Sequence, residues 1–200
     1  MNGDFIVIER AAEIAAQSAR IAVIGNTCSG KTAFSNRLKN YFDLPLLHVD
    51  SVQYLQNLML RDPNETRTIL KKYAENSHWI IDGVGPLKIL EDRLEKADLI
   101  VVVRPAILVN LYYLLKRQFS LIFGKRPELP AHENSEATPS RTVLLLKHMF
   151  NVHRGLWPQL DRILKSEKYS GRVVTFRASG EIDQFFQFLH HSNSQKGAEQ

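Results

Sequence analysis

The stretch Gly25–Thr32 most constrains how this chain folds. It reads G-N-T-C-S-G-K-T and matches the phosphate-binding pattern G-x-x-x-x-G-K-[ST] at every fixed position. The preceding residues, 20–24, end in an apolar run that is typical of a strand buried on both faces of a parallel sheet. Residues 32–42 then repeat large apolar side chains at every fourth position, which predicts a helix. Strand, glycine loop and helix therefore follow in the order that a phosphate loop requires.

The chemistry of the loop residues predicts what each of them does. The two glycines allow backbone conformations that other residues avoid, so that successive amides can point at one anion. We expect Lys31 to reach the β- and γ-phosphates and the Thr32 hydroxyl to bind Mg²⁺. The alternative is a glycine turn followed by a solvated lysine. The predicted nucleotide-binding residues are Gly25, Asn26, Thr27, Cys28, Ser29, Gly30, Lys31 and Thr32.

Length and composition suit one α/β domain. Two hundred residues are enough to bury a sizeable core, and the single cysteine cannot form an internal disulfide, which fits a reducing cytoplasm. No stretch reaches the ~18 uninterrupted apolar residues of a membrane span, and the first residues lack the layout of a secretion signal. We therefore expect a cytoplasmic protein with no membrane partner. The net charge of +5 favours an anionic ligand without specifying which one.

Two further apolar runs each end in an acid. Residues 44–49 precede Asp50, and residues 78–81 precede Asp82. Because ligands gather beyond the carboxyl ends of parallel strands, both acids are predicted site residues. We expect Asp82 to hold Mg²⁺ together with Thr32, and Asp50 to orient or deprotonate an acceptor hydroxyl or to hold the metal through water. The alternative for either acid is the cap of a turn, and His48 is predicted to pack rather than bind.

The remaining chain completes a predicted sheet of five parallel strands. Residues 98–103 and 172–177 are its last two strands. Residues 1–19 are predicted to form an extension helix, 20–191 the main domain with a lid at about 116–141, and 192–200 a mobile tail. Arg117, Arg126 and Arg141 are expected to neutralise the transferred phosphate from this lid, although solvated salt bridges are the alternative. The core face of the helix over residues 105–123 is predicted to hold Leu108, Leu111, Leu115, Phe119 and Ile122.

These motifs together resemble a known family. Gly25–Thr32, His48–Asp50, Trp79–Gly83 and the pair Arg126-Pro127 look like the small adenylate-kinase-related P-loop proteins called DNA topology modulation or FlaR-type kinases. The resemblance spans residues 21–188. It implies a three-layer P-loop NTPase fold of the nucleoside-monophosphate-kinase type, the cofactors ATP and Mg²⁺, and a basic lid.

Two positions depart from this family. The family has Asp-Gly-Asn-Tyr where this chain has Asp82-Gly83-Val84-Gly85. After the fourth strand the family has an acid directly before a proline, and this chain has Arg104 at that position. Both departures lie on the acceptor side and leave the ATP side intact.

The leading hypothesis is an ATP-dependent phosphotransferase that acts on a nucleotide or a small hydroxylated acceptor. The alternative is a nucleotide-dependent ATPase switch that binds nucleic acid or a protein; the basic stretch 141–154 motivates it. Aromatic residues near the basic ones are predicted to lie mostly on core faces, which disfavours a base-stacking surface. A GTP-specific protein is less well supported because the sequence offers no convincing Asn-Lys-x-Asp element. The oligomeric state and the acceptor stay open.

Overall fold

Five parallel strands form one sheet, as the sequence predicts. The structure is a computed structural model that describes residues 6–55, 59–85, 87–122 and 139–198. The strands are β1 (Arg20–Gly25), β2 (Leu46–His48), β3 (Trp79–Asp82), β4 (Leu99–Val103) and β5 (Val173–Phe176). Their order in the sheet is β2-β3-β1-β4-β5, and every neighbouring pair is parallel. The phosphate loop follows the central strand, so its neighbours β3 and β4 deliver their carboxyl ends beside it.

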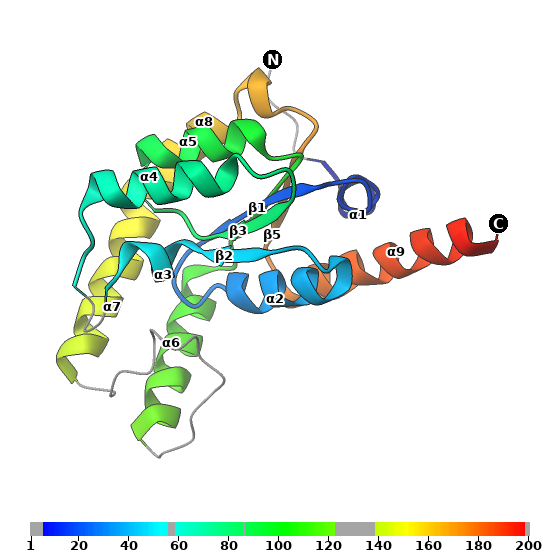
Figure 1. The fold of residues 1–200 in the computed structure, drawn as a ribbon. Coiled ribbons are helices and arrows are strands. Elements are labelled where there is room, and N and C mark those ends of the chain that lie inside the picture. The colour runs from blue at the N-terminus through cyan, green and yellow to red at the C-terminus, as the bar shows by residue number, and fades with distance from the viewer. Residues whose placement is uncertain (1–5, 56–58, 86, 123–138, 199–200) are drawn as a thin grey trace.

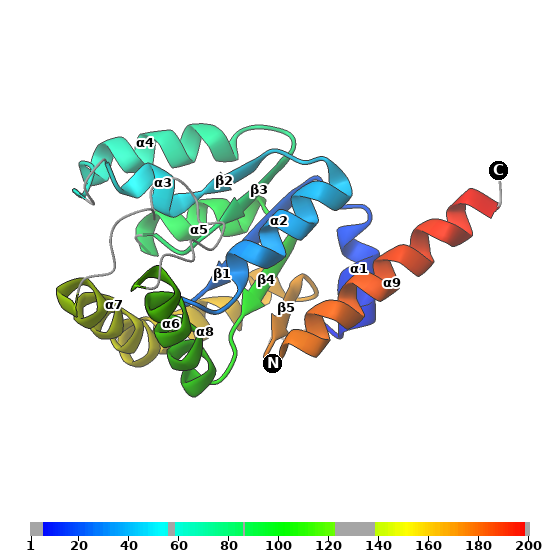
Figure 2. The same ribbon diagram turned by 90° about the horizontal axis from the view of Figure 1, so that it is seen from below.

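Helices cover both faces of this sheet (Figures 1 and 2). One core contains side chains of α3 (Val49–Gln53), α4 (Pro63–Ala74), α5 (Leu87–Lys96) and α8 (Trp157–Leu164). The other contains side chains of α1 (Ile8–Ala15), α2 (Lys31–Phe42) and α9 (Ser179–Ala198). Alternate residues of β1 and β4 enter opposite cores, as the two-residue period of a strand requires. This explains why both strands read as unbroken apolar runs.

The predicted extension helix belongs to the second core. Ala11, Ala12 and Ala15 of α1 are fully buried, and α1 packs against α9. The small alanine side chains let the two helices approach closely. Helix α9 continues to Ala198, so the residues predicted to form a tail begin inside this helix.

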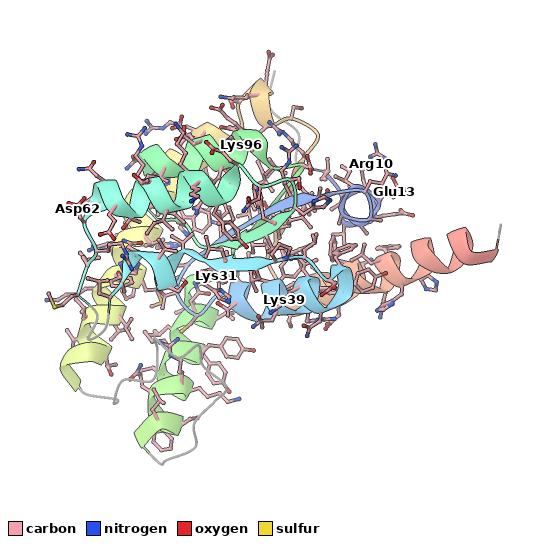
Figure 3. The ribbon with its side chains drawn as sticks, in the orientation of Figure 1. Arg10, Glu13, Lys31, Lys39, Asp62 and Lys96 are labelled. Carbon is pink, nitrogen blue, oxygen red and sulfur yellow. The ribbon has the colours of Figure 1, made fainter. Side chains whose placement is uncertain are left out.

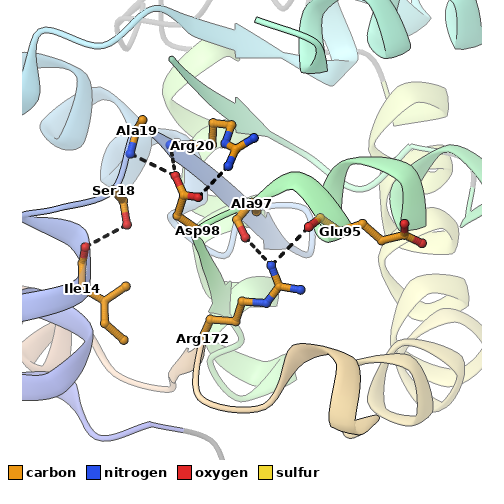
Figure 4. Close-up of polar contacts among 8 residues, drawn as sticks. All are labelled: Ile14, Ser18, Ala19, Arg20, Glu95, Ala97, Asp98 and Arg172. Carbon is orange, nitrogen blue, oxygen red and sulfur yellow. Dashed lines mark hydrogen bonds and ion pairs between the residues drawn. The ribbon is translucent and has the colours of Figure 1, made fainter. Parts of the chain in front are cut away.

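A polar cluster joins the amino ends of the strands, at the end of the sheet opposite the phosphate loop (Figure 4). Asp98 precedes β4 and accepts hydrogen bonds from the backbone N–H groups of Ala19 and Arg20 at 3.0 and 2.8 Å. The Arg20 guanidinium donates to its other carboxylate oxygen at 2.9 Å. Arg172 donates to the carbonyls of Ala97 and Glu95 at 2.7 and 3.2 Å. These contacts fix the starts of β1 and β4 and the approach to β5.

Helix α6 (Ile107–Ile122) corrects the sequence analysis. Its predicted core face is wrong, because Leu108, Leu115 and Phe119 are 73%, 50% and 64% exposed. The buried face instead carries Asn110, Leu114 and Gln118. The physical reason is visible in Figure 1, where α6 and α7 (Pro139–Asn151) project from the body as a two-helix arm, so most of α6 lies beyond the sheet.

A π-helical turn, Val152–Leu156, links α7 to α8. Trp157 begins the next helix, with its proline in the first turn. At the start of α4, Asp62 caps the helix by accepting from the backbone N–H groups of Asn64 and Glu65. Glu65 itself binds Arg61 at 2.7 Å rather than reaching back to the cap.

Candidate active site

The loop between β1 and α2 has the backbone of an anion-binding turn. Cys28 and Gly30 adopt left-handed conformations with φ of 57° and 91°, and Gly30 caps α2. An added Cβ at Gly25 would lie 2.6 Å from Ser29 Oγ and 2.8 Å from the Val103 carbonyl oxygen, so only glycine fits there. Successive amides of this loop and the positive end of α2 therefore face the same space beyond the central strand.

Asn26 holds the loop from within. Its side chain is buried, with 2% of the residue exposed. Its Oδ1 accepts from the backbone N–H of Thr27 at 2.7 Å, and its Nδ2 donates to the carbonyl of Met149 at 3.1 Å. The second bond ties the phosphate loop to the end of α7, a helix more than a hundred residues away in the sequence.

Thr32 and Asp82 meet across the boundary between α2 and β3, as the sequence predicts. The Thr32 hydroxyl donates to Asp82 Oδ2 at 3.2 Å. Parallel pairing of β1 with β3 sets Asp82 beside Val23, two residues before the loop begins. Asp82 is 3% exposed, and its Oδ1 has no hydrogen-bond partner among the described residues. A buried carboxylate oxygen left without a donor, next to a hydroxyl, is a donor set that fits Mg²⁺.

The cation would need additional oxygens from elsewhere. Within the described part of the chain, no group of three or more histidine, cysteine, aspartate or glutamate side chains forms a metal cluster. Mg²⁺ commonly keeps several waters and binds one or two protein groups together with substrate phosphates. The pair Thr32 and Asp82 matches that pattern rather than a cage made of protein alone.

His48 is a site residue that the sequence analysis assigned to packing. Its Nδ1 lies 2.9 Å from the same Asp82 Oδ2 that accepts from Thr32. The signal that identifies it is strand register: His48 ends β2 and Asp82 ends β3, and the two residues are direct partners in the parallel ladder. Polar side chains at the carboxyl ends of adjacent strands must come together.

Asp50 does not end a strand. Strand β2 stops at His48, and Asp50 lies half-buried in the short helix α3. The predicted strand is shorter than its apolar run because Val49 already turns into the helix and packs beneath the loop after β3. Burial, with a smaller contribution from the charge of Asp50, raises the pKa of the nearby Tyr54.

Arg93 on α5 is a second residue that the sequence analysis missed. It is 2% exposed, and its Nη2 donates to the carbonyls of Gly83 and Val84 in the loop that follows Asp82. Burial lowers the pKa of Arg93 to about 10, and the charges of Asp82 and Asp50 oppose this effect. Arg93 is therefore a buried cation behind the two predicted acids. In the sequence it looked like any other basic residue of an amphipathic helix.

The predicted basic residues are only partly described. Lys31 begins α2, directly after the loop (Figure 3). Arg117 is half-buried on α6. Arg141 lies in the first turn of α7, but its side chain is outside the described part, and Arg126 falls in the segment 123–138, which is also outside it. Their predicted contact with phosphate stays a prediction.

A hollow of about 280 Å³ lies between α3 and α4. It is formed by the end of α3, the residues before α4 and the first turn of α4. One of its lining residues, Thr66, is 1% exposed, and its hydroxyl has no hydrogen-bond partner among the described residues. The lining residues are Gln53, Leu60, Arg61, Asp62, Pro63 and Thr66.

Comparison with known proteins returns structural neighbours only. No protein-family model matches the chain, and no curated protein matches it. Among solved structures, a gluconokinase from Sinorhizobium meliloti 1021 is 11% identical, with 90% of this chain and 97% of that chain covered and a TM-score of 0.48. A shikimate kinase from Acinetobacter baumannii, in complex with shikimate, is 15% identical, with coverage of 92% and 98% and a TM-score of 0.48.

A shikimate kinase from Aquifex aeolicus vf5 is 19% identical, with coverage of 68% and 99% and a TM-score of 0.41. Because these identities and TM-scores are low, the fold is assigned from the chain's own sheet and phosphate loop. Membership of the topology-modulation family stays a prediction.

Proposed function

We propose that this chain binds a Mg²⁺–nucleoside triphosphate, with ATP as the expected nucleotide, and transfers its γ-phosphate to a small hydroxylated acceptor. The observation that carries the proposal is the contact between Thr32 and Asp82, which joins the end of the phosphate loop to a buried acid on the adjacent strand. A glycine turn with a solvated lysine would need neither a buried acid nor a hydroxyl facing it.

Each residue of the site has a defined task in this reaction. The loop amides and Lys31 bind and orient the β- and γ-phosphates, and Thr32 and Asp82 hold the cation. When bound, Mg²⁺ supplies the positive charge that neutralises the bridging phosphate oxygens. His48 and Arg93 keep Asp82 and the following loop in place. Because phosphoryl transfer needs little covalent help, positioning and charge neutralisation account for catalysis.

The acceptor belongs on the side of α3 and α4. Asp50 lies on α3, and the same helix contributes Gln53 to the hollow beside α4. An acceptor hydroxyl near Asp50 would lie beyond the carboxyl ends of β2 and β3, next to the cation site. Asp50 would orient this hydroxyl and accept its proton as the oxygen bonds to the γ-phosphorus, while the bond from that phosphorus to the nucleoside diphosphate breaks and the diphosphate leaves.

Calorimetry tests nucleotide binding directly. We expect Mg²⁺–ATP to bind the wild type, and both Lys31→Ala and Asp82→Asn to weaken that binding at least tenfold, since each removes a charged group at the phosphates or the cation. Lys39→Ala is the matched control, because Lys39 is an exposed lysine on the same helix. If the wild type binds neither ATP nor GTP, or if Lys31→Ala behaves like Lys39→Ala, the proposal is wrong.

Turnover separates transfer from binding. ADP release is measured against a panel of nucleoside monophosphates, nucleosides and small hydroxylated metabolites. At least one acceptor should raise the rate above the background of hydrolysis, and Asp50→Asn should reduce that stimulated rate without changing the affinity for ATP. A chain that binds ATP but responds to no acceptor would instead be a nucleotide-dependent switch.

A further inference from the structure

Large apolar side chains are exposed mainly on the projecting arm. Of the thirteen that are exposed among the described residues, nine lie on α6 or α7. Four of them, Leu108, Tyr112, Leu115 and Phe119, follow at spacings of four, three and four residues, which places them on one face of α6. Phe150 and Val143 lie on one face of α7 in the same way. A clustered apolar surface of this kind marks an interaction site.

Both exposed faces also carry a lysine. Lys116 is one position along from Leu115 and falls beside the apolar stripe of α6, and Lys147 falls between Val143 and Phe150 on α7. Both lysines are exposed. Neither α6 nor α7 contains an aspartate or a glutamate. The outer faces of the arm are therefore largely apolar, and the charged side chains on them are all positive.

The two faces turn away from the seam between the helices. Thr142 donates to Gln118 Oε1 at 3.2 Å, so these two side chains define where α7 meets α6. Tyr112 and Lys116 lie more than a quarter turn around α6 from Gln118, and Leu108 lies slightly less than a quarter turn from it. The arm thus exposes apolar side chains outside this contact, and its two helices project from the same side of the body in Figures 1 and 2.

We propose that this arm binds the surface of a bilayer that contains anionic phospholipids. Aliphatic and aromatic side chains would enter the boundary between headgroups and acyl chains, where tyrosine is favoured. The lysines would extend their stems along the apolar layer and place their ammonium groups among lipid phosphates. A fluid bilayer surface can contact the exposed faces of both helices of a projecting arm, whereas a rigid protein partner covers only one side of the arm.

Charge decides against two other occupants. A second copy of this chain would bring lysines against lysines, with no acid on either helix to compensate. Single-stranded nucleic acid would use the cations and the tyrosines, but it gives the exposed leucines and valine nothing to pack against. Peripheral binding of this kind needs no membrane span, and no described helix is long and apolar enough to form one. The proposal therefore departs from the expectation of no membrane partner, which rested on the lack of a span.

Co-sedimentation of the full chain with vesicles tests the proposal, which does not depend on the proposed phosphotransfer. We expect binding to phosphatidylcholine vesicles that contain phosphatidylglycerol, and much weaker binding to phosphatidylcholine alone. Replacing Lys116 and Lys147 by glutamine should weaken binding about fivefold for each lysine. Leu144→Gln should weaken it about tenfold. Leu60→Gln is the matched control for this exposed leucine of α7, because Leu60 is 65% exposed and Leu144 63%, and Leu60 precedes α4, outside both helices of the arm.

Each other outcome overturns the proposal. Equal binding to both kinds of vesicle, or none to either, removes the role of anionic lipid. An equal effect of Leu60→Gln and Leu144→Gln removes the role of the arm. Tighter binding to an oligothymidine than to vesicles would assign the arm to nucleic acid, and a dimer that Leu144→Gln dissociates would assign it to a second copy. Circular dichroism checks that each variant, altered at an exposed position, keeps its fold.

Discussion

The loop after Asp82 depends on two glycines that pack on Val49, and Gly85 gives a quantitative test of this packing. Gly85 has a φ of 64°, and an added Cβ would lie 3.0 Å from Val49 Cγ1. Gly171 is a natural control, because its φ is 75° and an added Cβ would meet no atom within 4 Å. At either position, alanine has the free-energy cost of a left-handed backbone. Only at position 85 does its Cβ also contact a buried side chain, that of Val49.

The expected cost follows from these two terms. The left-handed conformation costs a residue with a Cβ about 1 kcal/mol, so Gly171→Ala should lower the free energy of unfolding by about that amount. Overpacking a buried contact adds about 1–3 kcal/mol, so Gly85→Ala should cost about 2–4 kcal/mol. Val49 is fully buried, and Val49→Ala alone should cost about 1–3 kcal/mol because it deletes two methyl groups.

Urea unfolding of the four proteins of a double-mutant cycle gives the answer. In the Val49→Ala background Cγ1 is gone, so Gly85→Ala should cost only about 1 kcal/mol, like Gly171→Ala. The coupling between positions 49 and 85 should therefore be about 1–3 kcal/mol. Equal costs for Gly85→Ala and Gly171→Ala, or additive effects in the cycle, would refute the packing described here.

Three further predictions concern buried contacts. Phe34 packs against the rings of Phe176, Phe185 and Phe186 at centroid distances of 5.4, 5.6 and 5.6 Å, so Phe34→Ala should lower the free energy of unfolding by about 3–5 kcal/mol in urea titrations. Arg93→Met should cost about 2 kcal/mol or more because it leaves buried carbonyls unpaired, whereas Arg172→Met should cost about 1 kcal/mol or less, because the hydrogen bonds of Arg172 to the carbonyls of Glu95 and Lys168 are exposed; similar losses would contradict the role of burial. Between pH 7 and 9 this difference should stay constant, because the pKa of Arg93, lowered to about 10, keeps the side chain charged in both the folded and the unfolded state. Asn26→Ala should cost about 2 kcal/mol and should weaken ATP binding in calorimetry, and unchanged binding would show that the loop does not depend on this side chain.

The sequence predicted those parts of the fold in which a local sequence pattern is compatible with only one structure. Four strands were found because their apolar runs are buried on both faces, and Thr32 and Asp82 were matched because β1 and β3 are neighbours in a parallel sheet. Strand β2 has three residues, too few for a pattern to fix its end, so Asp50 was predicted to follow the strand directly and His48 was predicted to pack.

Helix α6 shows a different limit of sequence analysis. Its apolar period predicted a helix correctly and a buried face incorrectly, because periodicity reports which side is apolar and not what lies opposite it. The face with Asn110, Leu114 and Gln118 is buried although two of its three residues are polar. The exposed Tyr112 and Tyr113 likewise contradict the expectation that the aromatic residues near the basic ones lie on core faces.

One buried side-chain amide connects the phosphate loop to the arm. Asn26 lies within the turn that would cradle phosphate, and it donates to the carbonyl of Met149 at the root of the arm. If the arm has two positions that differ at this hydrogen bond, a nucleotide that prefers one of them also shifts the arm toward it. Reciprocity then requires that whatever holds the arm changes the affinity for the nucleotide by the same factor.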